Sequence, residues 1–83
     1  MPHLNLLTSK KTIGDQKILI LITKREKEIL KLISYEFSDK EIASQLFLSH
    51  HTIHSHRRSL MLKFDVKKSV GLIRKGFEMG LLE

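Results

Sequence analysis

Residues 38–58 read SDKEIASQLFLSHHTIHSHRR, and this stretch decides the fold. Ser38 and Glu41 form a capping-box pattern, in which each side chain accepts a hydrogen bond from the other residue's backbone N–H at the start of a helix. The apolar positions that follow share one helical stripe until the pattern breaks just before Ser49, which is a good N-cap for a second helix. The stretch therefore predicts a short helix, a tight turn and a longer helix, which is a helix-turn-helix motif at about 39–58.

Helices are also predicted on both sides of this motif. Thr23 and Glu26 repeat the capping-box pattern, and Ser69 is expected to cap the last helix. The expected architecture is all-α, a four-helix domain at residues 21–83 that follows a flexible or weakly structured arm at 1–20. The expected helices span about 24–35, 39–46, 50–63 and 69–80.

Length and composition exclude several classes of protein. The 83 residues, 41% of them hydrophobic, suffice for one small domain with a single core. The absence of cysteine excludes disulfides, thiol catalysis and Cys-type zinc sites. The longest apolar run, at 18–22, is far shorter than the roughly 20 residues that a membrane-spanning helix needs, and no signal peptide is visible, so a cytoplasmic protein is expected. Because no nucleophile–base pair, Gly-rich phosphate loop or carboxylate pocket is visible, an enzyme is not expected.

The positive charge is concentrated on the helix that follows Ser49. The chain carries 15 Lys and Arg against 9 Asp and Glu, a net charge of +6, which favours a polyanionic partner. Residues 49–63 contain basic side chains and a cluster of histidines, but no Asp or Glu. The excess charge on this one helix points to nucleic acid as the polyanion.

One face of this helix has the chemistry of a base-reading surface. Arg58 can donate two parallel hydrogen bonds to guanine O6 and N7, and the short side chain of Ser55 lets the helix sit deep in the major groove. The first N–H groups of the helix and the hydroxyls beside them would face phosphates, where the helix dipole also favours an anion. The residues expected to read bases are His51, His54, Ser55 and Arg58, and those expected to contact phosphates are Lys40, Ser49 and Thr52.

The last predicted helix has two apolar stripes. Val70 and Phe77 belong to one stripe, which is expected to face the core, and Leu72 and Met79 belong to the other. Because a helix in a small domain buries one side, the second stripe is expected to contact a second copy of the chain, and a helical glycine would allow close approach. The alternative is that this stripe packs against the apolar residues that precede Thr23. The expected dimer interface is Leu72, Gly76 and Met79.

Motifs along the chain occur in a characteristic order. They are Leu21-Ile22-Thr23-Lys24-Arg25-Glu26, Leu32-Ile33, Ser38-Asp39-Lys40-Glu41-Ile42-Ala43, Leu46-Phe47-Leu48-Ser49, Thr52-Ile53 with His56, and Gly80-Leu81-Leu82. This succession, over about residues 21–82, resembles the C-terminal helix-turn-helix domain of the LuxR family, also called the GerE or NarL/FixJ type. The resemblance implies a four-helix bacterial transcription regulator whose third helix enters the major groove and whose fourth helix forms the dimer. It implies base contacts at His54, Ser55 and Arg58, and contacts to the DNA backbone at Lys40, Thr52, Arg57 and Lys63.

The chain departs from the usual pattern of that family at several positions. Glu36 and Asp65 stand where glycine is usual, and both positions favour a positive φ. Lys24 replaces the usual proline, Asp39 replaces the usual asparagine, and Leu62 stands where a basic residue is common. Family regulators usually carry a sensor domain before this one. The chain is therefore either a stand-alone regulator or a piece of a longer protein, and its initial methionine favours the first.

The resulting prediction is a sequence-specific, double-stranded DNA-binding transcriptional regulator in the bacterial nucleoid. It is expected to be a homodimer that reads repeated half-sites, with RNA polymerase as a further partner and with no cofactor, metal or membrane. Two alternatives stay open: a metal-dependent DNA-binding module, because His50 and His54 have the i, i+4 spacing of metal ligands, and a protein–protein adaptor that uses the last helix. A membrane-surface module is disfavoured, because the face opposite Arg57 and Arg58 is needed for the core.

Overall fold

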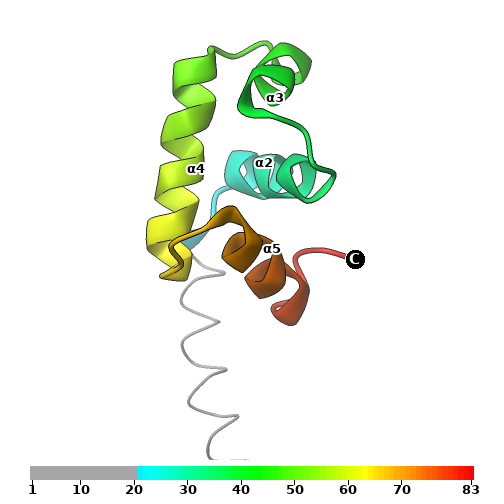
Figure 1. Cartoon of the computed structure of the whole chain (residues 1–83), viewed down its shortest axis with the longest axis vertical. Helices are drawn as coiled ribbons and strands as arrows, with labels where there is room; N and C mark the ends of the chain where they lie inside the picture. The colour runs from blue at the N-terminus through cyan, green and yellow to red at the C-terminus, as the bar shows by residue number, and fades with distance from the viewer. Residues whose placement is uncertain (1–20) are drawn as a thin grey trace, which may run out of the picture.

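A computed structural model describes residues 21–83, which fold into four α-helices without a strand. Figure 1 shows α4 standing along one side of the domain, with α3, α2 and α5 beside it from top to bottom. The predicted all-α, four-helix domain is confirmed in this part of the chain, whereas the predicted arm at 1–20 lies outside the described residues. The helices are α2 (Lys24–Ser34), α3 (Asp39–Leu46), α4 (His50–Phe64) and α5 (Ser69–Glu78).

The first three of these helices begin at the caps that the sequence predicts. Thr23 accepts a hydrogen bond from the backbone N–H of Glu26 at 3.1 Å, and the Glu26 carboxylate accepts from the N–H of Thr23 at 3.0 Å. Ser38 and Glu41 form the same reciprocal pair at the start of α3. Ser49 caps α4 by accepting a hydrogen bond from the backbone N–H of Thr52, the third residue of the helix. These caps satisfy backbone donors that would otherwise have no partner at each helix start.

The start of α5 differs from the prediction. Ser69 is not the N-cap but the first residue of the helix, and Lys68 holds the cap position without a side-chain hydrogen bond to the backbone. The Ser69 hydroxyl instead accepts a hydrogen bond from Arg57 Nη1 at 2.6 Å. The hydroxyl that the sequence suggested for capping is therefore used to join α5 to α4.

A left-handed residue follows each of the four described helices. Beyond each helix, a backbone N–H donates to a carbonyl five residues earlier, which is the Schellman arrangement. The positive φ expected at Glu36 and Asp65 is confirmed, but the left-handed conformation of Phe47 was not predicted. The φ angles are 67° at Glu36, 55° at Phe47, 55° at Asp65 and 75° at Gly80.

The core lies where α4 contacts each of the other three helices. The inward stripe of α4 carries Ile53, Leu60 and Phe64, and all three are buried. Burying an aliphatic or aromatic side chain of this size contributes about 1.5–3 kcal/mol, so this stripe fixes which face of α4 remains outside. The buried apolar residues are Ile29, Leu30, Ile33, Ile42, Ala43, Ile53, Leu60, Phe64, Leu72 and Leu82.

The core-facing side of α5 is the reverse of the one predicted. Leu72 is fully buried, and a Cβ atom added to Gly76 would lie 2.6 Å from the Leu82 side chain, so both residues belong to the protomer's own core. The prediction that Leu72 and Gly76 contact a second copy is therefore wrong, whereas Met79 is partly exposed. The reason is that Leu82 folds back onto this stripe behind α5. Val70 and Phe77, which were expected in the core, are 76% and 51% exposed.

Candidate nucleic-acid interface

The outward face of α4 presents the four side chains that were predicted to read bases. His51, His54, Ser55 and Arg58 are all exposed, because the buried stripe of the same helix occupies the opposite side. Arg58 forms no hydrogen bond or ion pair with any other described residue. Its five N–H donors are therefore available to a ligand, and a planar, unpaired guanidinium on an exposed helix suits bidentate recognition of guanine.

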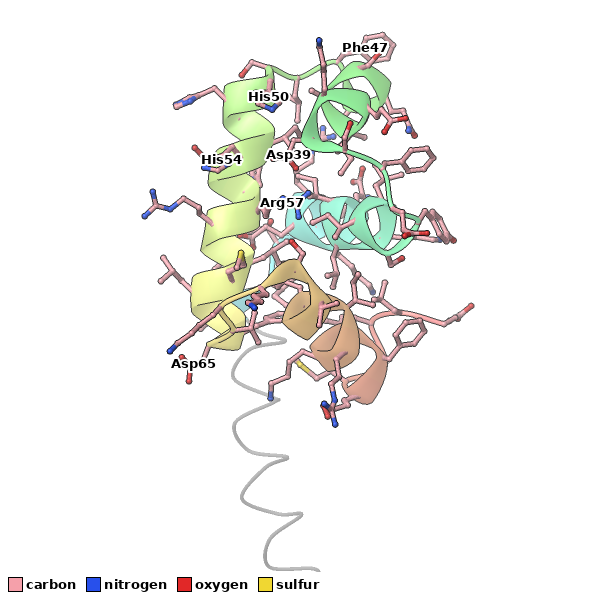
Figure 2. The ribbon with its side chains drawn as sticks, in the orientation of Figure 1. Asp39, Phe47, His50, His54, Arg57 and Asp65 are labelled. Atoms are coloured by element: carbon pink, nitrogen blue, oxygen red, sulfur yellow. The ribbon has the colours of Figure 1, made fainter. Side chains whose placement is uncertain are left out.

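No acidic side chain interrupts α4. From His50 to Phe64 the helix contains no Asp or Glu, and the nearest acid beyond its end is Asp65. Figure 2 shows Asp65 at the end of α4 far from His50 and His54. The part of α4 that carries the candidate base-reading residues can therefore approach a polyanion with little repulsion from its own helix.

The start of α4 carries hydroxyl groups that already hold each other. Ser49 Oγ lies 2.7 Å from Thr52 Oγ1 and also accepts from the Thr52 backbone N–H at 3.0 Å. Each hydroxyl keeps further hydrogen-bonding capacity, and Ser49 is exposed while Thr52 is half-buried. Lys40 is exposed on the neighbouring α3. Ser49 and Thr52 lie at the start of α4, where the helix dipole favours an anion, and Lys40 is the second residue of α3.

Arg57 lies inside the domain rather than on the candidate interface. Its Nε and Nη2 atoms donate to Asp39 Oδ1 at 2.8 and 2.5 Å, and its Nη1 donates to Ser69. The side chain of Arg57 is only 19% exposed, and that of Asp39 is 16% exposed. The family resemblance implied a contact between Arg57 and the DNA backbone, but in this structure the guanidinium already donates three hydrogen bonds to α3 and α5.

Lys63 is similarly occupied. Its ammonium group lies 2.6 Å from Glu26 Oε1 and donates to the backbone carbonyl of Leu21 at 2.8 Å. The Lys63 side chain is 25% exposed, so a phosphate would have to compete with a buried carboxylate for it. The structure thus brings together His51, His54, Ser55 and Arg58 on one face, and it diverts Arg57 and Lys63 to the interior.

These two interior pairs were hard to predict from the sequence. Asp39 and Arg57 are 18 positions apart, and Glu26 and Lys63 are 37 positions apart, so neither pair falls at a helical spacing. Asp39 drew attention only as a departure from the usual asparagine. The sole signal is the helical wheel of α4, on which Arg57 and its neighbour His56 fall close to the buried stripe.

The histidines of α4 do not form a metal site with other ligands in the described region. Over residues 21–83, no three His, Cys, Asp or Glu side chains lie together as metal ligands would. The same residues include no helix that is both long and apolar enough to cross a membrane.

Known proteins share this arrangement. The profile of the bacterial regulatory proteins, luxR family (GerE), matches residues 21–75. The chain is 43% identical over 60 residues to the uncharacterized response regulatory protein YgeK of Escherichia coli (strain K12). The aligned segment covers 72% of this chain and 41% of YgeK. It is 36% identical over 63 residues to the oxygen regulatory protein NreC of Staphylococcus haemolyticus, and this aligned segment covers 76% of this chain and 29% of NreC.

The fold has a solved counterpart of similar size. A structure of the transcription factor GerE aligns with a TM-score of 0.72 and 32% sequence identity, over 76% of this chain and 94% of the GerE chain. The chain therefore matches nearly the whole of that GerE structure, but it spans less than half the length of the two curated relatives named above.

Proposed function

The chain belongs to the luxR family of bacterial regulatory proteins, as a DNA-binding helix-turn-helix domain, and from that premise we propose that it reads double-stranded DNA sequence-specifically through α4. In this proposal α4 lies in the major groove, with its N-terminal half against the base edges. Its four base-reading residues are His51, His54, Ser55 and Arg58. Lys40, Ser49 and Thr52 contact phosphates and set the register of the helix on the duplex.

The observation that carries the proposal is the exposed Arg58, which has no partner among residues 21–83 and lies on the face of α4 opposite the core. An exposed arginine can remain without a protein partner in water at no energetic cost. The side chain of Arg58 stabilises neither the core nor a neighbouring helix. The adjacent Arg57 differs from Arg58, because it donates hydrogen bonds to Asp39 and Ser69. The two arginines of one helix thus divide between an internal structural role and an external binding role.

We further propose that the protein binds as a homodimer through the exposed side of α5. Val70 and Phe77 are large, exposed and separated by two helical turns, with the half-buried Ile73 between them. The three side chains lie on one face, so two copies could bury them against each other about a two-fold axis. Such a dimer would place two α4 helices in successive major grooves, which is the geometry that repeated half-sites require. Contact with RNA polymerase at a promoter in the nucleoid belongs to the same proposal.

Selection of binding sites from random duplex DNA at moderate salt tests the function. The expected result is an enriched motif for the wild-type chain, with a loss of preference at one base position in Arg58→Ala of about 1–3 kcal/mol. Lys27→Ala, which removes an exposed charge from α2, is the matched control and should leave the motif unchanged. Failure of the wild-type chain to enrich any motif would contradict sequence-specific binding.

A further inference from the structure

The two oxygens of Asp39 have different neighbours, and both neighbours lie on α4. Oδ1 accepts both hydrogen bonds from Arg57, while Oδ2 lies 3.8 Å from His54 Nδ1. Asp39 is the first residue of α3, so it reaches the middle of α4 from the adjacent helix. Figure 2 shows Asp39 on the α3 side of α4, level with His54 and above Arg57.

Asp39 is held in place and cannot turn away from His54 freely. Its side chain is 16% exposed and accepts two hydrogen bonds from Arg57. Arg57 is itself held in place, because it also donates to Ser69 at 2.6 Å. His54, by contrast, is 56% exposed and points from the face that carries the other candidate base-reading residues. A fixed carboxylate therefore lies behind an exposed, outward-facing imidazole.

A carboxylate can only accept hydrogen bonds, so it determines which ring nitrogen of a neutral histidine carries the proton. A movement of about 1 Å brings Nδ1 within hydrogen-bond distance of Oδ2, and the negative charge favours a proton on Nδ1 even before that movement. In the neutral ring, Nε2 is then left with a lone pair and can only accept. His54 would thus present an acceptor, not a donor, to whatever lies outside α4.

We propose that Asp39 is a positioning residue that determines specificity through His54, so that His54 Nε2 accepts a hydrogen bond from an exocyclic amino group of adenine or cytosine. The inference rests on the proposed function, since it requires α4 in the major groove. There the adenine N6 and cytosine N4 amino groups are donors, whereas guanine O6 and N7 and thymine O4 are acceptors. Asp39 therefore selects amino-bearing bases at one position without touching DNA itself.

The test compares binding-site selection for four proteins at about pH 8, where imidazoles are normally neutral. They are the wild-type chain, His54→Ala, Asp39→Asn and Asp65→Asn. Asn at position 39 keeps the size of the side chain, and while its oxygen accepts from Arg57 its NH2 group faces Nδ1 as a donor, so that Nδ1 must accept and Nε2 carries the proton. Asp65→Asn is the matched control, because it removes the same charge from an exposed residue at the far end of α4.

The inference predicts one position in the motif that depends on His54 and carries adenine or cytosine on the strand that His54 faces. Asp39→Asn should abolish this preference over guanine and thymine or reverse it toward them, while Asp65→Asn should retain it. A His54-dependent position that specifies guanine or thymine in the wild type would overturn the inference, as would an unchanged preference in Asp39→Asn or a motif unaffected by His54→Ala. In each of these results a motif is still enriched, so the proposed function survives; no motif at all would overturn both.

A second measurement needs no variant and so does not depend on how well Asp39→Asn folds. The wild-type chain is titrated with its selected duplex and with a duplex in which the adenine or cytosine at that position is replaced by an analogue without the amino group. Affinity should fall about fivefold, the value of one ordinary hydrogen bond. Equal affinity for the two duplexes would overturn the inference.

Discussion

Glu26 and Lys63 form an ion pair of 2.6 Å that joins the start of α2 to the end of α4. The Glu26 side chain is 4% exposed and also accepts hydrogen bonds from the backbone N–H of Thr23 at 3.0 Å and from the Ser59 hydroxyl at 2.8 Å. One carboxylate therefore caps its own helix and anchors the candidate recognition helix from behind. Its position makes the orientation of α4 depend on an interaction on the side away from the proposed DNA surface.

Replacing Glu26 should destabilise the fold more than replacing any exposed acid. Glu26→Ala leaves Lys63 without its carboxylate and removes half of the capping box, so the free energy of unfolding should fall by about 3 kcal/mol. Urea denaturation followed by circular dichroism measures this loss. Glu28→Ala, on the exposed side of the same helix, is the control and should change stability by less than about 1 kcal/mol. Similar losses in the two variants would show that the buried pair has no special role.

The same carboxylate predicts how stability depends on pH. Burial alone raises the pKa of Glu26, but the hydrogen bonds from Lys63, Thr23 and Ser59 outweigh it and hold the pKa below the ordinary value of 4.5. Because the folded pKa lies below the unfolded one, this contribution is complete above the ordinary value and is lost as pH falls through the folded pKa. Between neutral pH and acid, wild type should therefore lose more stability than Glu26→Gln does. Parallel stability curves for the two proteins would contradict this assignment.

Arg57 and Lys40 should differ in how they affect the salt dependence of DNA binding. Lys40 is exposed, so Lys40→Ala should lower the slope of log affinity against log salt by about one ion. Arg57→Ala should leave that slope unchanged, because its guanidinium faces Asp39 and Ser69, but it should lower the free energy of unfolding by about 2 kcal/mol. Binding titrations at several salt concentrations, with thermal melts of each variant, separate the two effects. If Arg57→Ala reduced the slope as Lys40→Ala does, Arg57 would have to leave its internal partners when DNA binds.

The proposed dimer depends on the exposed stripe of α5. Phe77→Glu places a charge on this stripe, so the variant should sediment as a monomer at concentrations where the wild-type chain is a dimer. It should also bind a duplex with two half-sites more weakly, while binding to one half-site is retained. Leu62→Glu makes the same change at a residue of α4 that is 78% exposed, and it should leave the mass in solution unaltered. A wild-type monomer both in solution and on a two-half-site duplex would contradict the dimer.

Backbone strain predicts that two substitutions to glycine are tolerated or stabilising. Glu36 and Phe47 have φ angles of 67° and 55°, and Phe47 is 94% exposed, so its ring contributes little packing. A left-handed conformation costs a non-glycine residue about 1–2 kcal/mol, and glycine removes this cost. Because glycine also has more freedom in the unfolded chain, part of the stabilisation is offset. Glu36→Gly and Phe47→Gly should each change the free energy of unfolding by between zero and about +1 kcal/mol.

The converse substitution provides the control for this strain. Gly80 has a φ of 75°, and a Cβ atom there would meet no atom within 4 Å, so Gly80→Ala tests backbone conformation without a steric clash. It should lower the free energy of unfolding by about 1 kcal/mol. A marked loss of stability in Phe47→Gly would instead show that the exposed ring packs against the domain.

Local signals in the sequence predicted most of the fold. The capping pairs led by Thr23 and Ser38 are patterns of neighbouring residues, so they specify helix starts without knowledge of the tertiary structure. The same holds for the outward face of α4, because the buried stripe of Ile53 and Leu60 fixes the opposite side by helical geometry alone. The exposure of His54 and Arg58 follows from that geometry.

Features that depend on distant residues were not predictable in the same way. α5 has apolar side chains on two sides, and periodicity cannot say which side is buried; Leu82 decides it by folding back beside Gly76. The pairing of Arg57 with Asp39 likewise depends on how α3 crosses α4. A basic residue at the edge between the buried and exposed faces of a helix can contact either DNA or an internal carboxylate. The sequence cannot decide between them until that crossing is known.

The central claim is that α4 reads DNA sequence, and the ratio of two affinities tests it most directly. The wild-type chain is titrated at physiological salt with its selected duplex and with a shuffled duplex of the same length and composition. The account predicts that the selected duplex binds tighter by about a thousandfold or more, the lower end of the range for specific regulators. Equal affinity for the two duplexes would contradict it, because phosphate contacts alone would then explain all of the binding.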